Sequence, residues 1–188
     1  MTIELLRTPQ SSDWAEVKRR ALVTVGKEAV KAPDPQWLKK ILTSRHSPIR
    51  YLQFSFLIKD IPYWLSTELS RHHEGCEKYI RSQRDDRNKT EVPRSEKPQG
   101  ALVSMIFDCN AESLMTIMNK RLCGCATKEM QELMLEIRAK VIEMNPEFTE
   151  FLVPMCEYIG HCTEVFSCCG KNALYFSRVK GGKDAERR

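Results

Sequence analysis

The residues best suited to chemistry lie close together in one basic stretch, from Arg71 to Arg87. Two histidines, four arginines, one lysine and one serine fall within these 17 residues, directly after an apolar segment. Like charges repel one another and long side chains lose rotamer freedom when they are fixed, so such a cluster costs free energy to assemble. A compact anion such as a phosphate would offset that cost. The stretch therefore predicts an anion-binding site.

The arginines are the reason to expect a phosphate as the anion. Its planar guanidinium matches a phosphate with two parallel hydrogen bonds, and it keeps its charge at physiological pH. Arg71 and His72 end an apolar helical segment, and Ser82 and Arg84 come further along the chain, so the two pairs could line one pocket across a loop. The alternative is a solvated basic loop, balanced by the acidic residues Glu74, Glu77, Asp85 and Asp86.

Length and composition indicate a globular protein with one substantial core. The chain has 188 residues, of which 41% are hydrophobic and 29% charged, and a chain of this size buries a real core. The formal net charge is +5, but acidic and basic residues are interspersed, so we expect an anionic ligand rather than nucleic acid. We find no signal segment or membrane-spanning run, and we therefore expect a cytoplasmic protein without a membrane partner.

Hydrophobic periodicity predicts helices and a few strands. Apolar residues three to four positions apart indicate a helix, and strict alternation indicates a half-buried strand. We therefore expect an α/β (α+β) fold with helices packed on a small, mostly antiparallel sheet. The expected helices cover 14–25, 35–42, 62–69, 111–122 and 127–145, and the expected strands cover 51–58 and 102–107.

Residues that favour helix starts precede three of these helices. Asp13 or Ser12 can cap the first, Asp34 the second, and Asn110 the helix over 111–122. Residues 85–100 show no periodicity and predict a long loop. We expect a single domain over residues 1–177, followed by a basic, flexible tail over 178–188.

Eight cysteines are the second unusual feature. In a cytoplasmic chain they are better explained as thiols or metal ligands than as a disulfide framework. Cys156, Cys162 and Cys168, with His161 beside them, could form a tetrahedral zinc site. Ordinary thiols are the alternative, because five residues separate successive cysteines, whereas paired zinc ligands are usually two residues apart.

Four short motifs occur in order along residues 14–145. They are Val23-Thr24, then Ser47-Pro48, then Phe54-Ser55-Phe56 with Arg71-His72-His73 and Ser82-Gln83-Arg84, and finally Asn110-Ala111-Glu112-Ser113-Leu114 with Arg121-Leu122. Together they resemble the signature regions of the flavin-dependent thymidylate synthases, the ThyX-like family. GxGxxG, GxxxxGK[ST], HExxH and GxSxG motifs are absent from the sequence, so other common enzyme chemistries lack support.

Membership in this family would imply a particular reaction. FAD, reduced by NADPH, would serve in methyl transfer from methylenetetrahydrofolate to dUMP, giving dTMP, without a cysteine nucleophile. The fold would be that of the thymidylate synthase-complementing proteins, and the assembly a homotetramer with its sites between subunits. The alternative is a non-catalytic nucleotide- or nucleic-acid-binding protein on the same fold, with or without a stabilising zinc ion. An inactive scaffold is a third hypothesis.

The resemblance also assigns residues to roles. The positions that contact FAD in the family correspond to Ser47, Arg71, His72, His73 and Asn110. Ser82 and Arg84 fall where the family holds the nucleotide. Arg121 falls where the family places an arginine against the pyrimidine ring, and a cation there would stabilise negative charge that develops on the ring during catalysis.

Overall fold

The computed structural model describes residues 1–87, 92–165 and 168–170. The chain divides into two compact units, Met1–Ser113 and Leu114–Arg188. The predicted tail over 178–188 lies outside the described residues, and the single domain over 1–177 stays a prediction. Among the helices described, none combines the length and the apolar character needed to cross a membrane.

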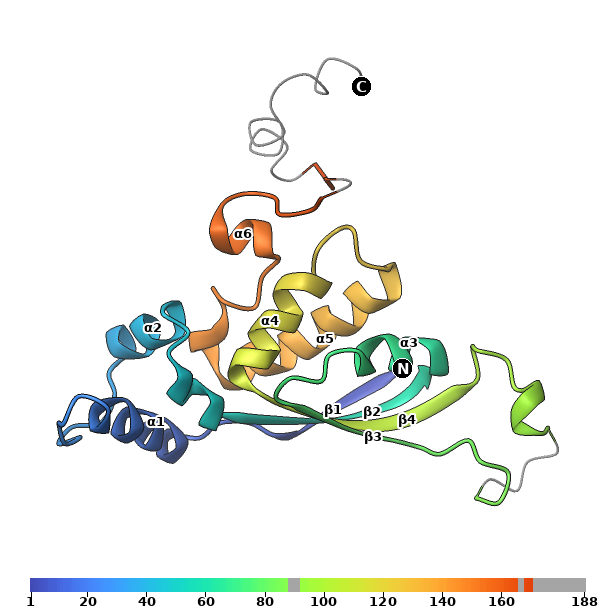
Figure 1. Ribbon diagram of the computed structural model, residues 1–188, viewed down its shortest axis with the longest axis horizontal. Helices are drawn as coiled ribbons and strands as arrows, with labels where there is room; N and C mark the ends of the chain where they lie inside the picture. The colour runs from blue at the N-terminus through green and yellow to red at the C-terminus, as the bar shows by residue number, and fades with distance from the viewer. Residues whose placement is uncertain (88–91, 166–167, 171–188) are drawn as a thin grey trace, which may run out of the picture. The chain divides into compact units, whose positions relative to one another are not determined.

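The first unit is built on a four-stranded antiparallel sheet (Figure 1). The strand order is β1-β2-β4-β3, so the long strands β2 and β4 lie in the centre and the short strand β3 lies at an edge. The strands are β1 (Thr2–Arg7), β2 (Gln53–Pro62), β3 (Cys76–Ile80) and β4 (Leu102–Asn110). Both predicted strands are present, although each is longer than expected. β1 and β3 were not predicted.

The predicted alternation in β2 places its large side chains in the core. Phe54, Phe56 and Ile58 are at most 1% exposed, and each faces a buried residue of β4 across the sheet. The Phe56 and Phe107 rings stack with centroids 6.2 Å apart. Burying an aromatic side chain of this size contributes roughly 2–3 kcal/mol, so this pair of strands anchors the unit.

The helices of the first unit follow their predicted positions closely. They are α1 (Ser11–Val23), α2 (Pro35–Thr43) and α3 (Tyr63–Ser70), with a short 3-10 helix, η1 (Ser47–Tyr51), before β2. α3 packs on the two central strands. Asp34 caps α2 as predicted, because its carboxylate accepts a hydrogen bond from the Trp37 amide at 2.9 Å.

The prediction for the start of α1 was wrong. Gln10 is the capping residue, and Asp13 occupies the third helical position, from which its carboxylate accepts a hydrogen bond from the Gln10 amide at 2.9 Å. Asp13 still satisfies an amide at the helix start, but from inside the helix. The helix also ends earlier than expected, and Val25, which was assigned to its apolar face, is 63% exposed.

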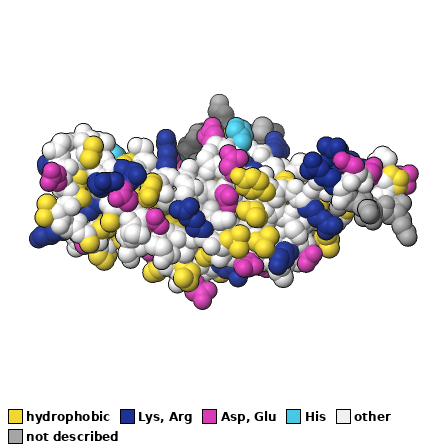
Figure 2. Space-filling model, turned by 90° about the horizontal axis from the view of Figure 1, so that it is seen from below, with side chains coloured by type: hydrophobic (Ala, Val, Ile, Leu, Met, Phe, Trp, Pro, Cys, Tyr) yellow, Lys and Arg dark blue, Asp and Glu magenta, His cyan; other side chains and the backbone are white. Residues whose placement is uncertain are grey.

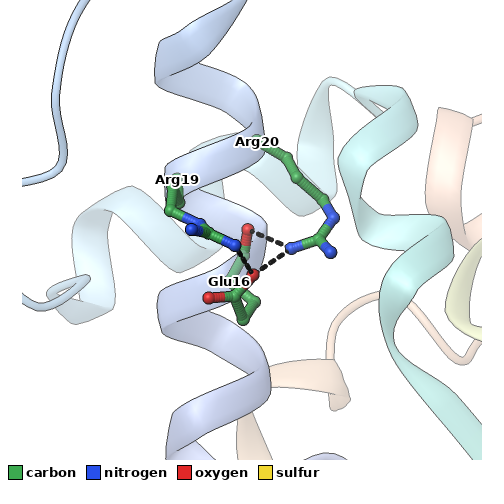
Figure 3. Close-up of polar contacts among 3 residues, drawn as sticks. All are labelled: Glu16, Arg19 and Arg20. Atoms are coloured by element: carbon green, nitrogen blue, oxygen red, sulfur yellow. Dashed lines mark hydrogen bonds and ion pairs between the residues drawn. The ribbon is translucent and has the colours of Figure 1, made fainter.

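The exposed face of α1 carries a small ion-pair cluster (Figure 3). Glu16 accepts hydrogen bonds from Arg20 and from Arg19, the latter at 2.8 Å. These bonds, first the one from Arg20, hold the pKa of Glu16 below its usual value. Such exposed pairs add little stability, but Arg19 provides a useful comparison for a candidate site arginine described below.

The second unit is helical. It contains most of α4 (Ala111–Arg121) and all of α5 (Lys128–Met144) and α6 (Met155–Ile159), with a 3-10 turn η3 (Pro146–Phe148) after α5. The apolar stripe of α5 is buried as its spacing predicts: Met130, Leu133, Met134, Ile137 and Val141. The architecture confirms the predicted fold class, with helices and a small antiparallel sheet.

Candidate functional site

The first turn of α4 begins at Asn110, the last residue of β4. As predicted, Asn110 caps this helix: its side-chain oxygen accepts a hydrogen bond from the Ser113 amide at 2.9 Å. Because strand and helix meet without an intervening loop, the position of Asn110 is set by the sheet on one side and by the helix on the other. Two other segments of the chain are joined to this first turn of α4 by hydrogen bonds and an ion pair.

The first of these segments is the loop that carries the two histidines. The Ser113 hydroxyl donates a hydrogen bond to the Glu74 carbonyl at 2.7 Å, and the Asn110 amide donates one to the Gly75 carbonyl at 3.0 Å. Gly75 has a left-handed backbone, with φ +63°. A Cβ atom at this residue would lie 2.1 Å from the Asn110 side-chain nitrogen. Only glycine therefore satisfies both the backbone conformation and the close approach.

The second segment is η1, which contains Ser47. The Arg50 guanidinium forms an ion pair with Glu112 in the first turn of α4. The Ala111 amide also donates a hydrogen bond to the Leu52 carbonyl at 2.9 Å, directly after η1. Three segments far apart in the sequence, η1, the 71–75 loop and the start of α4, are thus fastened to one another.

These three segments carry all five residues that were predicted to contact a flavin. Ser47, Arg71 and His73 are exposed, whereas His72 and Asn110 are partly buried. The His73 Nδ1 atom lies 3.1 Å from the Arg71 carbonyl oxygen, and the Lys78 ammonium donates to the His72 carbonyl. The backbone of the basic loop is therefore tied down, while cationic and hydrogen-bonding side chains remain accessible to a ligand.

A separate cavity lies beyond the other end of β3. Its volume is about 310 Å³. Arg81 and Lys97 supply basic groups to its lining, and Ser82 and Gln83 supply neutral hydrogen-bonding groups. Apolar residues complete the lining: Val92, Pro98, Ala101, Leu102 and Val103. A cavity that combines an apolar wall with a few basic and hydrogen-bonding groups suits a small anionic ligand that also has an apolar part.

Arg84 lies two residues after Ser82, and its guanidinium is already paired with a carboxylate. Its guanidinium forms a two-pronged hydrogen bond with Asp86, with both nitrogen–oxygen distances 2.9 Å. The backbone amide of Arg84 also donates to the Ser82 hydroxyl at 3.3 Å. The Asp86 carboxylate occupies the guanidinium fork in the way a phosphate would, so an anionic ligand at this arginine would have to displace Asp86.

The structure keeps the two groups of candidate residues apart within one chain. A loop between them would have let Arg71 and His72 meet Ser82 and Arg84, as the sequence suggested, but strand β3 fills the interval instead. At about 3.3 Å per residue, its five residues span roughly 15 Å. The flavin candidates lie before this strand, and the nucleotide candidates lie after it.

The remaining candidates belong to the second unit. Arg121 is the last residue of α4 and is partly buried. Among the predicted zinc ligands, Cys156 is buried, whereas Cys162 and Cys168 are partly exposed. Within residues 1–87, 92–165 and 168–170, no group of three or more His, Cys, Asp or Glu side chains is arranged to hold a metal ion. The structure thus adds no support to the zinc hypothesis.

The charge pattern of the surface bears on the nucleic-acid alternative. On the face shown in Figure 2, hydrophobic side chains gather near the centre, and basic and acidic side chains are interspersed around them. A nucleic-acid-binding face usually presents a continuous basic stripe. The mixed charges in this one view add no support to the nucleic-acid alternative.

Sequence reasoning missed three features of the site. Gly75 and Ser113, which fasten the basic loop, are recognisable only once the sheet register is known, although a glycine directly after two histidines and a glutamate was a usable turn signal. Lys97 lies in the stretch 85–100, which has no periodicity from which to place it. Asp108, on β4, carries a buried side-chain oxygen that has no hydrogen-bond partner among the described residues.

Comparison with known proteins supports the fold. No protein-family model and no curated protein sequence matches the chain. Solved structures do match. A Helicobacter pylori flavin-dependent thymidylate synthase ThyX, complexed with FAD and dUMP, is 15% identical, with a TM-score of 0.66 over 81% of this chain and 100% of that one. A second structure of that enzyme, also with FAD and dUMP, is 16% identical and has a TM-score of 0.60 over 74% and 92% of the two chains.

A related methylase matches equally well. The UMP/dUMP methylase PolB from Streptomyces cacaoi, bound with 5-Br dUMP, is 18% identical, with a TM-score of 0.64 over 81% of this chain and 96% of that one. At these identities the likeness establishes the fold. The function rests on the residues of this chain.

Proposed function

We propose that this chain is a flavin-dependent thymidylate synthase that methylates dUMP to dTMP, with FAD as cofactor, methylenetetrahydrofolate as carbon donor and NADPH as reductant. The observation that carries the proposal is the convergence of η1, the 71–75 loop and the start of α4. The Helicobacter pylori enzyme of similar fold was solved with FAD and dUMP, and all five candidate flavin residues of this chain lie on these three fastened segments.

The donors at this place fit the chemistry of FAD. The Arg71 guanidinium, the His72 and His73 imidazoles, the Ser47 hydroxyl and the Asn110 amide are hydrogen-bonding groups that suit a pyrophosphate and the polar edge of a flavin. When bound, FAD would supply the two-electron reduction that turns the transferred carbon into a methyl group. The protein would hold and orient the cofactor through segments whose backbones are already fixed.

The cavity beyond β3 supports dUMP as the substrate. Its basic groups, Arg81 and Lys97, suit a phosphate, and its apolar wall suits a pyrimidine ring. Ser82 would donate a further hydrogen bond. Arg84 would exchange the Asp86 carboxylate for the phosphate dianion, which offers two oxygens in the same geometry and carries more charge.

For Arg121 we propose the catalytic role that the resemblance implies. A guanidinium beside the pyrimidine ring would stabilise negative charge on the ring as its C5 atom becomes nucleophilic. It acts by position and charge alone.

The distance between the two candidate groups bears on the assembly. The separation of the two groups by β3 within one chain is consistent with a site that draws them from different copies. We therefore propose a homotetramer in which the flavin residues of one subunit and the nucleotide residues of another complete each site.

The test begins with the ligands. Purified protein should show flavin absorbance or be saturable with FAD, and calorimetry should detect dUMP binding. Arg84→Ala should weaken dUMP binding at least tenfold, because a charged hydrogen-bonding pair contributes roughly 1.5–3 kcal/mol. Arg19→Ala is the matched control, since Arg19 is also an exposed arginine paired with a carboxylate at 2.8 Å. It should leave dUMP affinity unchanged.

Activity is tested separately by rescue of a thymidine auxotroph. The unaltered chain should rescue growth and Arg121→Ala should not. Rescue by both would contradict the role given to Arg121. Protein that binds dUMP but neither binds FAD nor rescues growth would instead favour the non-catalytic nucleotide-binding alternative.

A further inference from the structure

Two cysteines face each other across the outermost pair of strands. Cys76 begins β3, and its partner in the antiparallel register is Cys109 of β4. Both are free thiols on the buried face of the sheet, 6% and 1% exposed. Neither has a role in the proposed reaction, and the sequence analysis placed its zinc candidates elsewhere. Their juxtaposition arises entirely from the register of β3.

The hydrogen bonds around this pair identify its geometry. The backbone amide of Asn110 donates to the Gly75 carbonyl. This bond joins the residue before Cys76 to the residue after Cys109. In an antiparallel ladder this pattern marks a non-hydrogen-bonded pair, whose Cα atoms lie ~4.5 Å apart with their side chains close together. At the other end of β3, the Arg81 amide donates to the Ser104 carbonyl, which agrees with the same register.

That spacing is compatible with a disulfide. Disulfides are found at Cα separations of roughly 4.4–6.8 Å, and the usual separation of a non-hydrogen-bonded pair lies at the short end of this range. β3 is also an edge strand. A small oxidant can therefore reach Cys76 when the edge strand opens locally, whereas Cys109 lies on a central strand.

The two thiols differ in their acidity. A hydrogen bond with the Cys109 thiol lowers the pKa of Cys76 below its usual value. Burial and the Glu77 carboxylate oppose this shift, and the Lys78 ammonium and the Ser113 hydroxyl add to it. Burial raises the pKa of Cys109 well above its usual value, and the Cys76 thiol and Asp108 act in the same direction. Cys76 is therefore the thiol that reacts first, because the thiolate is the nucleophile.

We propose that Cys76 and Cys109 are a dithiol–disulfide pair that is oxidised by small-molecule disulfides such as oxidised glutathione. The Cys76 thiolate attacks one sulfur of the oxidant, forming a mixed disulfide and releasing one glutathione thiolate. Cys109 then loses its proton and attacks the Cys76 sulfur, which releases the second glutathione. Two protein thiols are oxidised by two electrons, and one glutathione disulfide is reduced to two thiols.

Oxidation would lock the loop that carries Arg71, His72 and His73. The Cys76–Cys109 pair is adjacent to the Gly75–Asn110 hydrogen bond. A disulfide between these two residues would therefore prevent β3 from separating from β4 beside the loop. This consequence goes beyond the proposed reaction and can be measured without FAD or dUMP.

The test uses the full chain equilibrated with oxidised glutathione and then alkylated. Peptide mapping should find Cys76 linked to Cys109, with the mass of the linked peptides lower by two hydrogen atoms. In Cys109→Ser the mixed disulfide should instead remain on Cys76, because nothing resolves it. Cys125→Ser, which alters an exposed cysteine outside the pair, should still form the internal disulfide.

A second measurement does not depend on any variant folding. Hydrogen exchange of the amides in β3 should slow by roughly tenfold or more on oxidation, because local opening of the edge strand is blocked. Recovery of Cys76 and Cys109 as separately alkylated thiols after oxidation would overturn the proposal. Equal exchange rates in the two redox forms would contradict the locking of β3.

Discussion

Replacement of Gly75 by alanine tests how the basic loop is held to the start of α4. A left-handed backbone costs a residue with a Cβ atom about 1 kcal/mol or more. The new Cβ would also lie 2.1 Å from the Asn110 side-chain nitrogen and 2.4 Å from the Ser113 hydroxyl oxygen. Both side chains must therefore move, and their hydrogen bonds to the helix start and to Glu74 are lost.

The magnitude follows from these losses. Loss of the Asn110 cap costs about 1 kcal/mol, and loss of the hydrogen bond from Ser113 to Glu74 costs about 1 kcal/mol. With the backbone contribution, Gly75→Ala should lower the free energy of unfolding by about 3 kcal/mol, a large share of the 5–15 kcal/mol that is usual for a protein.

The chain offers a matched control in the same unit. Gly26 has nearly the same backbone angle, φ +66°, but a Cβ atom there meets nothing within 4 Å. Gly26→Ala should therefore cost only the backbone contribution, about 1 kcal/mol. Any gain from restricting the unfolded chain is the same in both variants and cancels in the comparison.

The assay is urea denaturation of both variants, followed by a signal from the first unit. The difference between the two free energies of unfolding should be about 2 kcal/mol, the value expected for the two lost hydrogen bonds. Equal values for Gly75→Ala and Gly26→Ala would refute the reasoning, because they would mean that the contacts with Asn110 and Ser113 contribute nothing.

Three further predictions concern other parts of the molecule. Asp86→Asn should tighten dUMP binding, at most roughly fivefold, because it releases Arg84 from an exposed ion pair; calorimetry that shows weaker binding would contradict the proposed competition. Asp34→Ala should lower the free energy of unfolding by about 1 kcal/mol through loss of the α2 cap, and an unchanged urea midpoint would contradict it. Iodoacetamide should modify Cys76 at a lower pH than Cys123, whose pKa is raised to about 11, chiefly by burial; mass spectrometry that finds the reverse order would contradict the assignment of Cys76 as the reactive thiol.

Elements with a long, regular pattern could be predicted from the sequence. β2 alternates over its first six residues, and α5 repeats its apolar positions over about three turns, so tertiary structure only had to bury faces that already existed. β3 has just five residues, and its charged side chains interrupt the apolar alternation. Its position depends on pairing with β4, and that pairing cannot be read from a short segment alone.

The parts of the candidate site that lie within a short stretch of sequence could be predicted. The basic loop and the Asn110 cap are each local features, and a local pattern was enough to find them. Their attachment through Gly75, Ser113 and Glu112 joins positions tens of residues apart, so it became visible only in the folded chain. The separation of Ser82 from Arg71 likewise depends on whether the interval is a loop or a strand.

The edge position of β3 also bears on solubility. An edge strand presents unpaired backbone groups that can template pairing with another chain and lead to aggregation. β3 is short and carries the charged residues Glu77 and Lys78. A short edge strand with charged side chains disfavours pairing with a further strand. The same five residues that separate the two candidate sites thus also protect the sheet from growing at its open edge.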